Sequence, residues 1–476
     1  MITRRDLITS AAAACGALPG PRTLGAQPGK SRPNILLLFP DQHRFDWTGF
    51  NKNLAVRTPN LDRLAQRGMR FTNAVVASPL CAPSRACLAS GKEYENCRVR
   101  DNTEDYPLDQ KTYYTLLRES GYHTAACGKI DLHKASPTWG LDGKHLLPEW
   151  GFSDGIDNAG KGDAVTSGAS APKDPYMEML YKRGLAAAHI ADFKRRRKDG
   201  YAATFPTPLP EDAYCDNWIA ANALELMSRF PRGKPWHLAI NFTGPHNPED
   251  ITVRMEKLVR GRDFVQPNRC REFTRDQHVA IRQNYTGMVE NIDRLVGRLL
   301  EELKKRGELE NTLVVYSSDH GEMLGDHNRW GKVLPYHASA AVPMVIAGPG
   351  VRDGVVSDAL VSHMDLAATF LEFASVRKPA EMDSRSMKSL LEGKTRQHRE
   401  AVRSGLGAWR MAFDGRYKLV RGFDADTSSR DLHHAAGAAK LAGPLLFDLQ
   451  DDPLENVNIA PKAGRHVERL SKFLSV

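Results

Sequence analysis

Short, unbroken apolar runs recur along the chain and are separated by longer amphipathic segments. The first run occupies residues 34–39, and similar runs occupy residues 236–242, 312–316 and 342–347. Apolar runs of this length, without alternation, are typical of strands that are buried on both faces of a sheet. The pattern therefore predicts a central sheet with covering layers on both sides.

Helical patterns lie between these runs. Thr58 is a suitable cap, Pro59 suits the first helical position, and apolar residues follow at helical spacing as far as Gly68. A long amphipathic helix is predicted over residues 279–306, and another helix over residues 365–373. Buried strands that alternate with helices indicate an α/β domain with a mostly parallel sheet.

The pattern changes in the last fifth of the sequence, where the apolar segments become short and alternate with polar residues. Such segments occupy residues 411–413, 417–420 and 445–449. They are typical of a small antiparallel sheet. We therefore predict a main α/β domain over residues 33–376 and a smaller C-terminal α+β subdomain over residues 377–476.

The N-terminus carries the pattern of an export signal. Arg4 and Arg5 precede an apolar stretch over residues 7–18, so we expect a twin-arginine signal peptide over residues 1–26. The alternative is an ordinary N-terminal helix, but the glycines and prolines that follow would end it. The sequence does not favour a lipid anchor at Cys15, because the usual bulky aliphatic residue upstream is missing. The signal implies the twin-arginine export machinery as a partner and a periplasmic or secreted protein.

Composition narrows the class of protein. Of the 476 residues, 41% are hydrophobic and 26% are charged, as in a soluble globular protein. There is no apolar run of about 18 residues, so an integral membrane protein is not expected. The net charge of +9 favours an anionic ligand such as a phosphate, a sulfate or an acidic glycan. The dense basic run over residues 194–198 is interpreted as a solvated face, and no nucleic-acid-binding signature accompanies it.

Polar side chains follow two of the predicted strands where those strands end. The first strand runs into Asp41 and Gln42, and the strand over residues 312–316 is followed by Asp319 and His320. Open α/β sheets place their sites at the carboxyl ends of strands. Two carboxylates, an amide oxygen and an imidazole predict a single site for a divalent cation, with calcium preferred and magnesium or manganese as alternatives. A helix cap for Asp41 and a hydrogen-bonded loop position for His320 are the structural alternatives.

A third segment is more specific. Residues 79–91 read Pro-Leu-Cys-Ala-Pro-Ser-Arg-Ala-Cys-Leu-Ala-Ser-Gly and contain the C-x-P-S-R pattern between Cys81 and Arg85. With this motif the chain resembles the type I sulfatases of the alkaline phosphatase superfamily. The resemblance covers residues 33 to 460 and extends to Asp41-Gln42, Gly128-Lys129, Pro245-His246, Ser318-Asp319-His320-Gly321, Gly331-Lys332, Leu446-Phe447-Asp448-Leu449 and Asp452-Pro453.

The resemblance implies an alkaline-phosphatase-like α/β/α sandwich and a modified nucleophile. In the family a maturation enzyme oxidises the motif cysteine, here Cys81, to formylglycine, which also joins the metal ligands. Pro83 suits the first turn of a helix, so Cys81 should lie just ahead of a helix N-terminus, where anionic groups are favoured. Arg85, one turn further on, can reach back to the modified side chain. One hydroxyl of the hydrated aldehyde attacks sulfur, and deprotonation of the other expels sulfate.

The family roles of three further residues follow from the same resemblance. Lys129 and Lys332 would hold the sulfate oxygens, and His246 would supply a proton to the ester oxygen. Many sulfatases have histidine two residues after the first lysine, whereas this chain has Asp131 there and His133 two residues later. If the segment is extended, these side chains point the same way. Either Asp131 takes the role, or it pairs with Lys129 and leaves His133 to reach the substrate.

The metal residues also depart from the commonest family pattern. Several sulfatases have Asp-Asp and Asp-Asn where this chain has Asp41-Gln42 and Asp319-His320, a version that resembles choline sulfatases, phosphonate monoester hydrolases and some glycan sulfatases. We therefore expect a hydrolase of organic sulfate esters, acting on a sulfated carbohydrate or another small sulfated metabolite. The alternatives are a phosphonate or phosphate ester hydrolase of the same superfamily and a non-catalytic sulfoglycan-binding protein.

Overall fold

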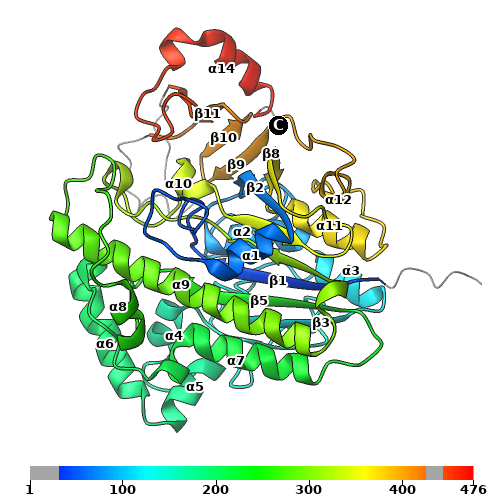
Figure 1. Ribbon diagram of the computed structural model, residues 1–476, viewed down its shortest axis with the longest axis vertical. Helices are drawn as coiled ribbons and strands as arrows, with labels where there is room; N and C mark the ends of the chain where they lie inside the picture. Colours follow the sequence, from blue (N-terminus) through cyan, green and yellow to red (C-terminus); the bar gives the residue numbers. More distant parts are fainter. Residues whose placement is uncertain (1–31, 425–442, 475–476) are drawn as a thin grey trace, which may run out of the picture. The chain divides into compact units, whose positions relative to one another are not determined.

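Figure 1 shows the computed structural model of the chain, which describes residues 32–424 and 443–474. The predicted signal over residues 1–26 and Cys15 lie outside the described residues. From Pro33 onward the chain forms one compact unit. Among the described helices, none combines the length and the apolar character that crossing a membrane requires.

The main sheet of the described chain has eight strands, and all but one of them run parallel. The exception is β7, which is antiparallel to both of its neighbours. The strands lie in the order β4 (Asp154–Asp157), β3 (His123–Gly128), β5 (Trp236–Pro245), β1 (Asn34–Asp41), β6 (Thr312–Tyr316), β7 (Met344–Ala347), β2 (Gly68–Val75) and β8 (Val355–Ser362).

Helices cover both faces of this sheet (Figure 1). Alternate residues of β1 separate the two layers: Leu37 packs in the cluster that holds α2, α3 and α11, whereas Leu38 packs in the cluster that holds α1, α7 and α9. The α/β/α sandwich expected from the sequence is confirmed. The helices are α1 (Pro59–Gln66), α2 (Cys81–Ser90), α3 (Tyr113–Glu119), α4 (Lys161–Gly168), α5 (Pro175–Lys182), α6 (Ala186–Asp199), α7 (Cys215–Ser228), α8 (Val253–Val259), α9 (Arg275–Lys305), α10 (His337–Ala340), α11 (Asp365–Phe373), α12 (Lys388–Leu391) and α14 (Gly464–Ser471).

A separate antiparallel sheet has the order β12-β11-β10-β9. Its strands are β9 (Val402–Leu406), β10 (Trp409–Phe413), β11 (Tyr417–Arg421) and β12 (Leu445–Asp448). Leu470 of α14 packs on Leu419 and Leu446 of this sheet. The small C-terminal sheet is therefore present as predicted, while the proposed domain boundary at residue 376 stays a prediction.

Candidate active site

Cys81 opens helix α2 at the bottom of a cavity. The sequence suggested a position just before the helix, but Leu80 is the capping residue and Cys81 is the first helical residue. The Cys81 side chain is 1% exposed, and its Sγ lies 3.3 Å from Nε2 of His320. Burial and Asp41 raise the pKa of the Cys81 thiol, but Lys129, Lys332 and His320 outweigh them and lower it to about 5. The position stabilises negative charge at this side chain.

Four buried side chains converge here in a way that fits a metal ion. The ligand atoms of Asp41, Cys81, Asp319 and His320 all lie within 4.8 Å of one another. Oδ1 of Asp41 is buried and accepts no hydrogen bond from the described residues. An unpaired carboxylate oxygen in a buried cluster is costly unless a cation binds it. The donor set, two carboxylates with an imidazole and a sulfur or oxygen, could bind a divalent ion.

Gln42, the fifth predicted ligand, is held beside this cluster by contacts of its own. Its backbone N–H donates to Oδ1 of Asp319 over 3.0 Å, and its side-chain oxygen accepts from Nζ of Lys332 over 2.7 Å. Its amide nitrogen donates to Glu322. The φ of Gln42 is 68°, a conformation that the hydrogen bond to Asp319 supports. A role for Gln42 as a metal ligand therefore stays a prediction.

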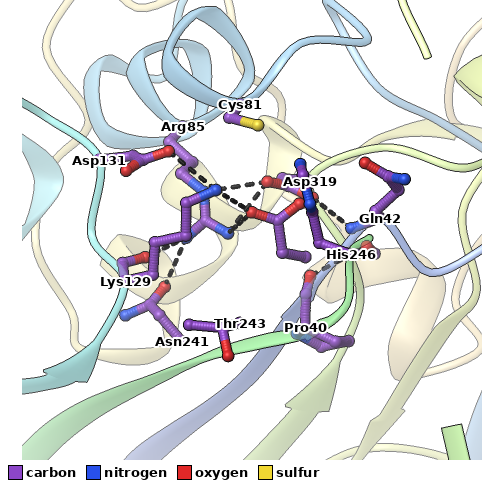
Figure 2. Close-up of polar contacts among 12 residues, drawn as sticks. Pro40, Gln42, Cys81, Arg85, Lys129, Asp131, Asn241, Thr243, His246 and Asp319 are labelled. Atoms are coloured by element: carbon purple, nitrogen blue, oxygen red, sulfur yellow. Dashed lines mark hydrogen bonds and ion pairs between the residues drawn. The ribbon is translucent and has the colours of Figure 1, made fainter. Parts of the chain in front are cut away.

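Arg85 of α2 extends toward the carboxylates of the cluster and binds them (Figure 2). Its Nε and Nη2 lie 3.0 and 2.9 Å from Oδ2 of Asp319, and Nη2 lies 3.5 Å from Oδ2 of Asp41. Nη1 donates to the backbone oxygen of Lys129. Arg85 thus balances the buried negative charge and ties strand ends β1, β3 and β6 to helix α2.

Lys129, Lys332 and His246 also line the cavity, which has a volume of about 620 Å³. Nζ of Lys332 lies 2.5 Å from Nε2 of His246, while Nδ1 of His246 lies 2.6 Å from the carbonyl oxygen of Asn247. A carbonyl can only accept, so Nδ1 donates and Nε2 accepts from Lys332. Burial and the charge of Lys332 hold the pKa of His246 well below 6.5. His246 is therefore neutral here and accepts a hydrogen bond from Lys332.

The segment after Lys129 differs from the extended chain considered above. Asp131 has a φ of 57°, so the backbone turns at this residue, which aspartate tolerates better than most. Oδ2 of Asp131 lies 3.0 Å from Nζ of Lys129 and 3.1 Å from Nζ of Lys134. Figure 2 shows Asp131 and Lys129 on one flank of the site, with Gln42 on the other. Lys134, which the sequence analysis missed, lines the cavity.

His133 turns away from the cavity. Its Nε2 lies 2.9 Å from Oδ2 of Asp157, and its ring stacks on Trp150 with centroids 5.3 Å apart. Neither His133 nor Asp131 is among the described residues that line the cavity. The turn at Asp131 accounts for this, because Lys134 lines the cavity in place of His133. An aspartate between two lysines was the only signal in the sequence for this arrangement.

Family models match most of the chain. The model described as Sulfatase matches residues 33–376, and the model described as N-sulphoglucosamine sulphohydrolase, C-terminal, matches residues 325–474. An arylsulfatase from Clostridium perfringens is 27% identical over 474 residues, which cover 93% of this chain and 94% of the relative. An N-acetylglucosamine-6-O-sulfatase from Bacteroides thetaiotaomicron is 27% identical over 479 residues, with 91% and 83% covered.

Solved structures share the fold. The phosphonate monoester hydrolase of Agrobacterium radiobacter superposes with a TM-score of 0.74 at 22% identity, covering 93% of this chain and 94% of that chain. A protein solved with its substrate D-glucosamine-2-N,6-O-disulfate gives a TM-score of 0.70 at 22% identity, with 93% and 97% covered. The resemblance drawn from the C-x-P-S-R segment is confirmed, and the chain belongs to the sulfatase family of sulfuric ester hydrolases.

Proposed function

We propose that this sulfatase hydrolyses the sulfate ester of a carbohydrate or another small metabolite, with Cys81 converted to formylglycine by a maturation enzyme. The observation that carries the proposal is the position of Cys81. It begins α2, lies 3.3 Å from His320 and faces a cavity that Lys129 and Lys332 also line. A negatively charged group is stabilised at this point by the helix N-terminus and by both lysines.

The chain's own residues support the reaction as follows. Lys129 and Lys332 bind the oxygens of the sulfate group and offset the charge that develops on them. Nζ of Lys332 and Nε2 of His246 are in hydrogen-bond contact, and this pair supplies the proton that the leaving alcohol needs. Formylglycine, when formed, supplies the hydroxyl that attacks sulfur. Water is consumed overall, and the products are the free alcohol and sulfate.

A metal ion would be held by Asp41, Asp319 and His320 together with the modified Cys81, with Gln42 at the edge of the set. Such an ion polarises a sulfate oxygen and helps to ionise the nucleophile. Calcium is the proposed ion because oxygen donors predominate. The imidazole of His320 replaces an oxygen donor, so magnesium or manganese should compete more strongly than in an all-oxygen site.

A phosphonate or phosphate ester hydrolase is the second candidate. Lys129 and Lys332 would bind any tetrahedral oxyanion, and one relative, 26% identical over 491 residues, is a multifunctional alkaline phosphatase superfamily protein from Trinickia caryophylli. Rates on matched aryl sulfates, phosphates and phosphonates separate the candidates. We expect the sulfate ester to be the best of the three.

Mass spectrometry tests the nucleophile directly. Trypsin should release residues 71–85, because Arg70 and Arg85 flank this peptide. In active enzyme its mass should be that of the aldehyde or its hydrate. Cys81→Ala should lower the turnover number by roughly a millionfold, the scale of losing a nucleophile. The matched control Cys270→Ala, outside the cavity, should retain full activity, and active enzyme that contains only the thiol would refute the proposal.

We also propose export through the twin-arginine machinery. Support comes from Arg4, Arg5 and the apolar stretch that follows them. Replacing both arginines with lysine should retain the protein in the cytoplasm, as measured by fractionation of the producing cell. Export that continues unchanged would refute this part of the proposal.

A further inference from the structure

The cavity wall contains one buried carboxyl group that the catalytic arrangement does not use. Glu249 lines the cavity and is 2% exposed, and its Oε1 accepts no hydrogen bond from the described residues. Its backbone is fixed, because Nδ2 of Asn284 donates to its carbonyl oxygen over 2.6 Å. A buried carboxyl oxygen without a partner is unfavourable, so a bound molecule that pairs with Oε1 gains affinity.

The cations around Glu249 do not neutralise it. Lys161, which also lines the cavity, is committed to Asp250 with Nζ and Oδ1 2.7 Å apart. Burial and the neighbouring carboxyl of Glu322 raise the pKa of Glu249 well above 4.5. A protonated carboxyl has one donor and also acceptor oxygens, as an alcohol group does. It suits a hydroxyl partner and does not repel a nearby sulfate.

Aromatic side chains line the same cavity. Tyr201 and Trp330 stack with centroids 4.4 Å apart, and Phe193 of α6 also lines the cavity. Nε1 of Trp330 donates to Oε2 of Glu272 over 2.6 Å, which fixes the indole ring. Aromatic walls with a few directional polar groups are typical of sites for small molecules. The cavity volume of about 620 Å³ leaves room for a ring beside the sulfate group.

We propose that Glu249 determines specificity by exchanging hydrogen bonds with a hydroxyl group of the leaving alcohol, and that this alcohol is a sugar ring lying along the aromatic wall. The inference rests on the proposed sulfatase activity and narrows its substrate class. An aryl sulfate offers no hydroxyl to Glu249, so it would bind without satisfying the carboxyl. A site built to pair with a hydroxyl discriminates strongly against molecules that lack it.

Kinetics with two substrate classes test this. Glu249→Leu should lower kcat/KM for the best sulfated monosaccharide by about 10–100-fold, the value of one or two buried hydrogen bonds, and should change kcat/KM for 4-nitrophenyl sulfate less than threefold. Glu249→Gln keeps both a donor and an acceptor and should retain most of the sugar activity. The control Glu211→Leu removes another carboxyl with an unpaired buried oxygen, outside the cavity, and should affect neither substrate.

Several outcomes would overturn the inference. Equal losses on both substrates would show a structural role, and a loss with Gln as large as with Leu would show that the carboxyl acts as an anion toward a cationic substrate. Wild-type enzyme that cleaves aryl sulfate but none of a panel of sulfated monosaccharides would refute the sugar assignment alone. Enzyme inactive on every sulfate ester would refute the proposed function itself. If Glu249→Leu does not fold, deoxy analogues of the best sugar sulfate are tested with wild-type enzyme instead. For one of these analogues, kcat/KM should fall by a factor similar to that expected for the variant.

Discussion

Two sets of buried charges involve the segment over residues 331–337, and their contacts differ. The first set lies at the carboxyl edge of the main sheet and lines the cavity with two lysines, Lys129 and Lys332. The second set consists of Lys418 of β11, which is 0% exposed, and Glu455 of the loop after β12, which is 4% exposed. The first set faces a substrate, and the second faces the backbone of the segment that carries Lys332.

Hydrogen bonds from the C-terminal region position the backbone of this segment. Nζ of Lys418 donates to the carbonyl oxygen of Pro335 over 2.8 Å, and Oε2 of Glu455 accepts from the N–H of His337 over 2.6 Å. Nε1 of Trp409 donates to the carbonyl oxygen of Val333 over 3.1 Å. Three residues of the C-terminal region therefore hold the chain just after Lys332. The small sheet contributes to the site without lining it.

The two buried lysines Lys129 and Lys418 differ in their charge balance. Burial lowers the pKa of each. Asp131 and Asp41 more than compensate at Lys129, whose pKa is raised well above 10.5. Lys418 has Glu455 as its only carboxylate partner among the described residues, and its pKa stays below 10.5. The number of carboxylates around a buried lysine thus decides whether its charge is strongly held, as catalysis requires, or only balanced.

The largest expected effect comes from breaking the Lys418–Glu455 pair. Lys418→Met leaves a buried carboxylate unpaired, and should lower the free energy of unfolding by about 3–5 kcal/mol in urea titrations. The double variant Lys418→Met, Glu455→Gln removes both charges while keeping an acceptor for the His337 N–H, and should recover most of the loss. A double variant no more stable than the single one would show that the charge pair is not the cause.

Lys332→Met should act in the opposite way, on rate and not on stability. It removes a charge that faces the substrate, so kcat should fall by about 10²–10³-fold. The melting temperature should change little, because the methionine stem still fills the same space. A loss of stability comparable with that of Lys418→Met would erase the distinction between the two sets of charges.

The segment after Lys129 gives the next effect in size. Asp131→Asn should lower kcat/KM about tenfold, or about 1.4 kcal/mol, because Lys129 and Lys134 lose a shared carboxylate. His133→Phe should change kcat/KM less than threefold but should lower stability by about 1–3 kcal/mol, since it leaves Oδ2 of the buried Asp157 without its partner. A hundredfold rate loss with His133→Phe and none with Asp131→Asn would favour the alternative in which His133 serves the substrate.

Local sequence patterns predicted the elements whose signals are local. The helix over 365–373 matches α11, and β6 matches its apolar run. Helix α9 begins at Arg275, four residues earlier than predicted, because Thr274 and Gln277 form a capping box ahead of the apolar pattern. Strand β2 was missed because three of its eight residues are polar and not fully buried, and pairing with β7 and β8 completes it.

The residues of the site also divide into those that sequence motifs predict and those that only the folded chain reveals. Cys81, Asp41, Asp319 and His320 follow recognisable motifs at strand ends or a helix start, and the structure brings their ligand atoms together. The directions of the Lys134 and His133 side chains depend on the backbone turn at Asp131, and a single aspartate does not predict such a turn. No motif marks Glu249, because only the folded chain shows that its buried Oε1 accepts no hydrogen bond from the described residues.

The smallest effect is a pH dependence that distinguishes the two lysines. The lowered pKa of Lys418 means that, as pH rises toward 10.5, the folded protein releases this proton before the unfolded chain does. Stability contributed by Lys418 should therefore increase with pH in that window, by at most about 1.4 kcal/mol per pH unit. Lys129 behaves oppositely, because its raised pKa makes its contribution decline only above 10.5. Urea unfolding between pH 8 and 10.5 should show wild type gaining stability relative to the variant Lys418→Met, Glu455→Gln. The absence of any relative gain over this range would mean that the pKa of Lys418 is not lowered by folding, and the two lysines would then not differ in kind.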